Sequence, residues 1–136
     1  MTMVRSTLLL ATLALTAPAL AQSAEKPVPS AQRVASEKLP NVPGKSVTAV
    51  EVTFPPGAIS APHHHAGSVL VYVLEGAVRS QIDDLAPTVY RAGQTFFEPP
   101  GAHHVYSASA SPTERARILA VFVADDGATL TTYDAK

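Results

Sequence analysis

All five histidines of this chain fall into two short clusters, and imidazole is the commonest metal ligand among side chains. The first cluster is the run of three histidines at residues 63–65, and the second consists of His103 and His104. In an extended strand alternate side chains share a face, so His63 and His65 point to one side and His64 points to the other. One imidazole from the second cluster would complete a three-histidine metal site.

The N-terminus has the pattern of a secretory signal peptide. Arg5 supplies a basic start, residues 8–15 form an apolar core, and Ala-Leu-Ala at residues 19–21 offers a cleavage site. The apolar stretch is too short to span a bilayer core of about 30 Å. We therefore expect residues 1–21 to be cleaved, the mature protein to be secreted or periplasmic, and no membrane span to remain.

Composition excludes several classes of function. The length of 136 residues suggests one folded domain. The net charge is −1 and basic residues form no run, so we expect no binding of nucleic acid. The chain has no cysteine, which excludes disulfides and thiolate metal ligands and fits an exported bacterial protein.

The remaining chain divides into an arm and a β domain. Residues 22–45 are rich in Pro, Ser, Ala and Lys without a sustained period, which predicts an extended arm, partly disordered or lying on a neighbouring subunit. Residues 46–136 show short alternating apolar segments separated by turn residues. Such a pattern predicts an all-β sandwich or barrel. The expected strands lie at residues 47–54, 68–74, 77–82, 88–90, 95–98, 104–107, 118–123 and 129–133.

Residues 68–74 are apolar on both faces, which is typical of a fully buried strand. The alternation does not place Phe54 or Tyr72 inside or outside the barrel. An apolar barrel wall with few polar groups suits a small, largely hydrophobic substrate. Three valines of this segment share one face and are expected to line the barrel: Val69, Val71 and Val73.

The first histidine cluster lies in a segment with regular spacing. Five residues separate Gly57 from His63, and three separate His65 from Val69. Six further residues lead to Gly76. The glycines indicate turns at both ends of the segment.

The second cluster lies in a comparable segment. Five residues separate Gly93 from a Pro-Pro-Gly turn at residues 99–101, two more lead to His104, and three more lead to Ala108. Together the two segments resemble the two motifs of the cupin superfamily, and the resemblance covers roughly residues 47–123. The family pattern has an asparagine where Ala108 stands here.

The resemblance implies a double-stranded β-helix, or jelly-roll, barrel with a divalent metal inside its mouth. Carried over position by position, it makes His63, His65 and His104 the metal ligands. The family's glutamate ligand is replaced by Val69, which cannot bind metal. The resemblance favours Fe or Mn, with Zn possible, since imidazole suits several metals. Three neutral ligands would leave the full charge on the ion, which favours an anionic substrate.

Two other polar residues could substitute for the lost carboxylate. Glu98 precedes the second turn and is the one acidic candidate for catalysis near the motif, although it also fits a solvated strand end or a partner of an arginine. Gln81 could reach the cavity from the next strand.

His64 is expected on the surface. His103 could exchange with His104, but the motif spacing assigns the metal position to His104.

Two classes of function remain open. The first is a metal-dependent enzyme on a small organic molecule, either a dioxygenase or a lyase or isomerase. The second is a non-catalytic module that binds or senses a small ligand. Cupins are commonly dimers, so the resemblance implies a homodimer in which the arm, residues 22–45, covers an exposed strand edge of the partner.

Overall fold

The computed structural model describes residues 26–135, which form ten β-strands and no helix. Within this range no helix is long and apolar enough to cross a membrane. The predicted signal peptide, residues 1–21, lies outside the described residues. The strands are β1 (Ser30–Lys38), β2 (Lys45–Phe54), β3 (His63–His65), β4 (Ser68–Glu75), β5 (Ala77–Ile82), β6 (Thr88–Arg91), β7 (Thr95–Glu98), β8 (His103–Ser109), β9 (Ala116–Asp125) and β10 (Thr131–Tyr133).

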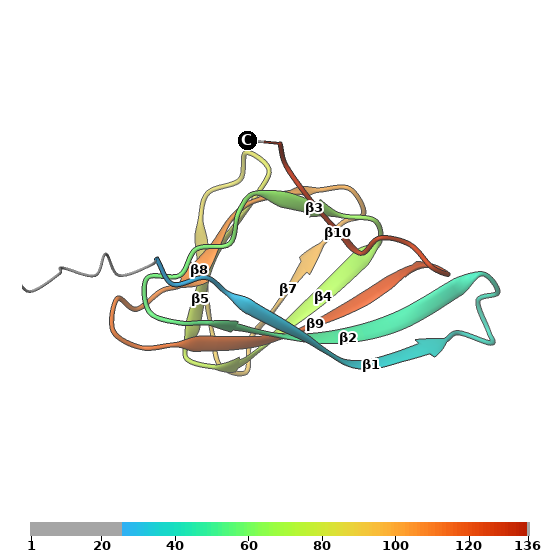
Figure 1. Cartoon of the computed structure of the whole chain (residues 1–136), viewed down its shortest axis with the longest axis horizontal. Helices are drawn as coiled ribbons and strands as arrows, with labels where there is room; N and C mark the ends of the chain where they lie inside the picture. Colours follow the sequence, from blue (N-terminus) through green and yellow to red (C-terminus); the bar gives the residue numbers. More distant parts are fainter. Residues whose placement is uncertain (1–25, 136) are drawn as a thin grey trace, which may run out of the picture.

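The strands form two five-stranded sheets, which confirms the predicted all-β jelly-roll fold. The long sheet has the order β1-β2-β9-β4-β7, and the short sheet has the order β10-β3-β8-β5-β6. All the strand pairs are antiparallel. In Figure 1, β3 and β10 lie at the top of the molecule and β1, β2 and β9 lie at the bottom.

Strand β9 shows why the sequence adopts this architecture. Its even-numbered residues from Ala116 to Ala124 are buried, and the odd-numbered residues between them are more exposed. This period of two turns one face of the strand toward the interior. Gly76, with a φ of 69°, makes the tight turn between β4 and β5, where a Cβ atom would lie 2.5 Å from the carbonyl oxygen of Arg115.

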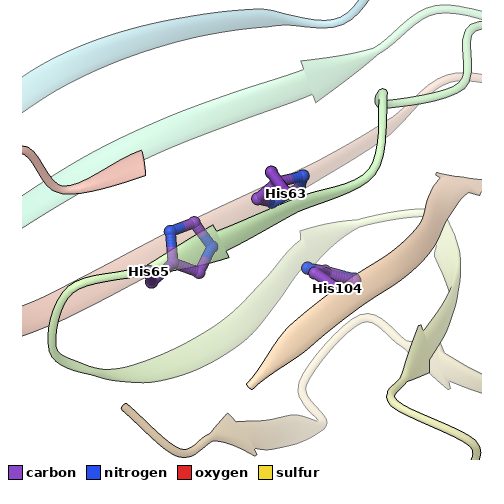
Figure 2. A group of neighbouring side chains, drawn as sticks. All are labelled: His63, His65 and His104. Atoms are coloured by element: carbon purple, nitrogen blue, oxygen red, sulfur yellow. The ribbon is translucent and has the colours of Figure 1, made fainter. Parts of the chain in front are cut away.

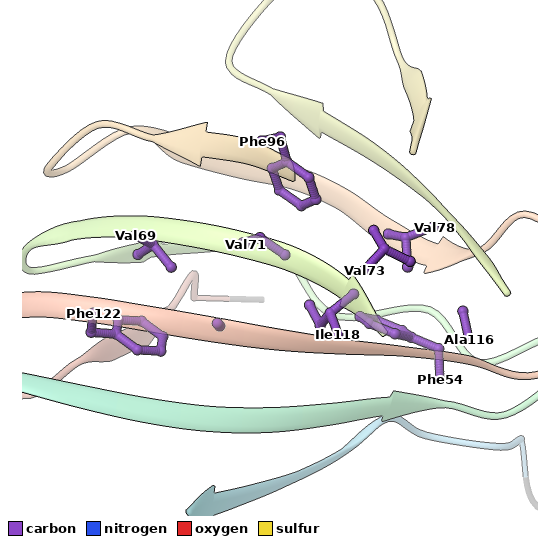
Figure 3. Close-up of a cluster of buried hydrophobic side chains, with 10 residues drawn as sticks. Phe54, Val69, Val71, Val73, Val78, Phe96, Ala116, Ile118 and Phe122 are labelled. Carbon is purple, nitrogen blue, oxygen red and sulfur yellow. The ribbon is translucent and has the colours of Figure 1, made fainter. Parts of the chain in front are cut away.

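The hydrophobic core lies between the sheets. The inward valines of β4 are at most 1% exposed, as predicted, and Phe54 is also inside, at 2%. Close packing of these side chains fixes the position of β4 and β9 relative to the short sheet. Figure 3 shows the core residues, among them Phe54, Val69, Val71, Val73, Val78, Phe96, Ala116, Ile118 and Phe122.

Strand β4 is buried on one face only, which corrects the expectation of a fully buried strand. Leu70, Tyr72 and Leu74 lie on its outer face and are 50, 43 and 38% exposed. The reason is that a barrel of two sheets has one interior, so each strand has a single buried face. Apolar residues on the outer face therefore do not mark a second core.

Part of the predicted arm is a strand of the long sheet, which corrects the interpretation of that segment. Strand β1 pairs with β2 of the same chain, from Ser30 opposite Thr53 to Lys38 opposite Ser46. All nine residues of β1 are exposed. Because neither face is buried, no apolar period marks this strand in the sequence.

We expect Gly67 to tolerate no side chain. A Cβ atom there would lie 2.1 Å from the carbonyl oxygen of Val123 and 2.7 Å from Cβ of Ala124. Gly67→Ala should therefore destabilise the protein by about 2 kcal/mol or more. Gly93→Ala is the control, because φ is 88° and no atom of the described chain would lie within 4 Å of the new Cβ, so it should lose only about 1 kcal/mol through backbone strain. Urea unfolding measures both, and equal losses would contradict the close approach.

Candidate metal centre

Three imidazoles converge between the two sheets. His63 and His65 lie on the same face of β3, and His104 lies on β8 directly opposite His63. All three are buried, at 7, 6 and 4% exposure, and their candidate ligand nitrogens lie within 4.8 Å of one another (Figure 2). The structure thus brings together the three residues that the motif spacing selected.

Backbone carbonyls fix the orientation of two of the rings. Nδ1 of His63 donates to the carbonyl oxygen of Ala61 over 2.7 Å, and Nδ1 of His65 donates to that of Leu130 over 3.0 Å. A carbonyl can only accept, so in each neutral ring the proton lies on Nδ1 and Nε2 keeps its lone pair. Partners of this kind hold metal-binding histidines in the correct tautomer.

The third ring is held by a serine that sequence reasoning missed. Nε2 of His104 shares a hydrogen bond of 2.9 Å with Oγ of Ser80, which is 3% exposed on β5. Gln81, which the sequence offered as a second candidate, does not line the cavity, because successive side chains of a strand alternate. No sequence motif marks this serine, so only the pairing of β5 with β8 could have identified its contact with His104.

The other two histidines lie on the opposite side of the same strands. The side chains of His64 and His103 are 45 and 44% exposed. Nδ1 of His64 lies 3.8 Å from the carboxylate of Asp134, and Nε2 of His103 contacts the same carboxylate. The expected outward position of His64 is confirmed, and His104 rather than His103 faces the site.

Burial keeps the two rings of β3 neutral. Desolvation is the largest influence on His63 and on His65, and it lowers the pKa of each from the ordinary value of 6.5. The carbonyl of Ala61 and the carboxylate of Glu98 oppose this effect but do not reverse it. A neutral imidazole offers a lone pair, so the donor set fits a divalent metal at neutral pH.

Glu98 reaches the histidines from the opposite sheet. It ends β7 and is 3% exposed. Its Oε2 lies 3.1 Å from Nδ1 of His104 and 3.5 Å from Nε2 of His65. The sequence was compatible with either an inward or a solvated side chain at Glu98, and the structure places the carboxylate inward. A catalytic role for Glu98 stays a prediction.

The three imidazoles open into a cavity of about 130 Å³. Exposed residues at both ends of the described chain, Ser30, Ala31 and Tyr133, also line it and mark its mouth. This volume is below the roughly 300–1,000 Å³ of sites for drug-sized ligands, so it suits a small molecule. Most of the apolar wall comes from β2 and β9 of the long sheet: Val50, Val52, Phe54, Ile118, Ala120 and Phe122.

Two antiparallel sheets closed around inward-facing histidines define a double-stranded β-helix with a three-histidine site. A family model described as the cupin domain matches residues 50–122, which is more than half of the chain. The chain therefore belongs to the cupin family. A comparison with curated proteins finds no match.

Solved structures share the fold at low identity. An uncharacterised conserved protein with a double-stranded β-helix domain from Klebsiella pneumoniae is 22% identical with a TM-score of 0.62, over 80% of this chain and 86% of that one. A mutant of Bacillus subtilis oxalate decarboxylase is 22% identical with a TM-score of 0.56, over 64% of this chain and 23% of that one. A DMSP lyase from Ruegeria pomeroyi is 20% identical with a TM-score of 0.57, over 64% of this chain and 42% of that one.

The metal-free protein should lose stability as the pH falls. The folded-state pKa values of His63 and His65 lie below the unfolded value of 6.5, so the unfolded chain binds more protons in acid. Their contribution to the free energy of unfolding is complete above the unfolded pKa and decreases as the pH falls toward the lowered folded pKa. Urea unfolding at several pH values from neutral to acid measures this loss.

A double variant, His63→Gln with His65→Gln, is the control for that series. Exposed acidic residues away from the site titrate equally in both proteins, so the difference between wild type and the variant reports the two histidines together with the groups they contact. We expect a shallower decrease in the variant. Identical slopes in the two proteins would contradict the burial of neutral rings.

Proposed function

We propose that this cupin is an exported, metal-dependent enzyme of the dioxygenase or lyase type that acts on a small organic molecule. The observation that carries the proposal is the set of three buried imidazoles at the wall of a mostly apolar cavity. Export follows from the predicted signal peptide at residues 1–21. A substrate with an apolar body and an anionic group suits both the cavity wall and a cation.

His63, His65 and His104 would hold the ion, with iron or manganese favoured by the family resemblance and zinc possible. A bound ion would supply Lewis-acid or redox chemistry at an oxygen of the substrate. The chain itself orients the rings through Ala61 and Leu130 and surrounds the site with apolar side chains that exclude water.

Two structural neighbours support chemistry rather than binding alone. One is named an oxalate decarboxylase and another a DMSP lyase, and both are enzymes by those names. The matched region covers only 23 and 42% of these two proteins, so both are considerably longer than this chain. Here they support the proposal that a barrel of this kind can host a reaction of a small molecule.

A specific observation favours the alternative, a non-catalytic module that binds a small ligand. Glu98 is the single acidic residue among the described residues that line the cavity, and it lies against His104. The described lining therefore offers no separate pair of carboxylates for general acid and base. The alternative predicts ligand binding with no turnover.

The first test is the metal content of the protein purified without a histidine tag or nickel column, together with His104→Ala. We expect near-stoichiometric Fe, Mn or Zn in the wild type and little in the variant, because one of the imidazole ligands is lost. His103→Ala is the matched control, since that ring faces outward, and it should keep its metal. Equal metal content in His104→Ala and wild type would exclude the site.

The loaded protein then separates the two functions. Oxygen uptake or product formation with a panel of diketones, catechols and small carboxylates would establish the enzyme. A ligand-induced increase in melting temperature without turnover across that panel would favour the binding module instead.

The outer face of the long sheet supports a homodimer as part of the proposal. Leu70 lies beside Phe97 on β7 and Val121 on β9, so apolar side chains continue across three strands. Leu70 and Phe97 are 50 and 55% exposed, and Tyr72 beside them is 43% exposed. A two-fold axis through this face would cover the same apolar patch on both copies.

Charge placed on this face should separate the copies. We expect a dimer mass for the wild type by light scattering and a monomer mass for Leu70→Glu combined with Phe97→Glu, because like charges would meet across the axis. Leu85→Glu is the control, since this leucine is 64% exposed in the turn between β5 and β6 and should leave the mass unchanged. A monomeric wild type would exclude the dimer.

A further inference from the structure

Two buried polar atoms of the site face each other without a hydrogen bond. Oε2 of Glu98 and Nδ1 of His104 have no hydrogen-bond partner among residues 26–135, although both are buried and lie 3.1 Å apart. Leaving buried polar groups unsatisfied is costly, and the cost is larger for a carboxylate. A pair of such atoms at this separation indicates a missing group that contacts both.

A positive group between the two atoms would suit both, and no lysine or arginine is among the described residues that line the cavity. Where Nε2 of His104 donates to Ser80, its Nδ1 presents a lone pair to the carboxylate, and two lone pairs repel each other. A divalent cation between the atoms would turn this repulsion into two ligand bonds.

The strand register explains how the carboxylate comes to be there. Glu98 on β7 is directly opposite Val69 on β4, which occupies the position of the usual glutamate ligand in the family resemblance. Directly opposite residues of an antiparallel pair share a face, with Cβ atoms about 4.5–5.5 Å apart. Both side chains are inside, at 3 and 0% exposure. The carboxylate is therefore displaced by one strand and stays on the inner face.

We infer that Glu98 is the fourth protein ligand of the metal, replacing from β7 the carboxylate that β4 lacks. The inference rests on the metal site of the proposed function and adds a ligand to it. The site then has three imidazoles and one carboxylate, so the bound ion keeps a net charge near +1 instead of +2. It also assigns the Glu98 carboxylate to the metal rather than to proton transfer.

The test measures the affinity for Co²⁺ and Zn²⁺ by competition with a chelator, together with the visible absorption of the Co²⁺ form. Glu98→Gln should weaken binding by about tenfold or more and change the Co²⁺ spectrum, because an anionic oxygen ligand is lost. Glu75→Gln is the control, since it removes the same charge from an exposed ion pair with Arg115, and it should bind as wild type.

A position swap tests the geometry. Glu98→Val alone should weaken metal binding, and Val69→Glu combined with Glu98→Val should restore most of it, because the carboxylate returns to the facing strand. Melting of each metal-free variant shows that it is folded, and Glu98→Gln, which keeps the side-chain size, provides the measurement if the valine variants do not fold.

The outcomes separate this inference from the proposed function. Wild-type affinity and an unchanged Co²⁺ spectrum in Glu98→Gln, with binding lost in His104→Ala, would overturn the role of Glu98 and leave the three-histidine site intact. Wild-type affinity in His104→Ala would overturn the metal site and the inference together. Weakened binding in Glu98→Gln with recovery in the swap would support the fourth ligand.

Discussion

The antiparallel register between β3 and β8 is the constraint on which the site depends. It places His63 opposite His104 on the inner face and His64 opposite His103 on the outer face. A slip of one residue would exchange the two sets, because the side-chain period of a strand is two. Strand β3 has only three residues, but pairing with β8 on one side and β10 on the other holds it between two neighbours. Strand β10 also places Leu130, just before its first residue, against the ring of His65.

Burying this set of groups opposes stability, so another part of the molecule must provide the folding energy. The inner valines of β4, with Phe54 and Ile118, form a compact core beside the site. Burial of each such side chain contributes roughly 1.5–3 kcal/mol. The sheets thus separate two tasks: the long sheet supplies most of the apolar core and the short sheet supplies the histidines. Glu98 is the exception, since its strand belongs to the long sheet and its carboxylate meets the imidazoles of the short one.

Sequence patterns predicted most clearly the strands in which buried and exposed residues alternate. Strand β9 alternates clearly and was expected, whereas β1 has no buried face and was interpreted as an arm. Strand β4 was expected to be buried on both sides because its outer face is apolar, and an apolar outer face has the same composition as a core face. The histidines were identified because their spacing within the two motifs can be counted along the sequence. Ser80 was missed because its contact with His104 exists only across the strands β5 and β8.

The pair of Val69 and Glu98 shows how a motif that runs along one strand differs from a site built by several. Along the chain, a valine at position 69 indicates that a ligand has been lost, and this led to the expectation of a site with imidazoles alone. Across the sheet, the facing residue at position 98 carries a carboxylate to within 3.5 Å of two of the imidazoles. A metal selects donor atoms by type and position, and not by the strand from which they come. The inner face of this barrel can therefore keep the donor chemistry of its family while the family's sequence pattern is incomplete.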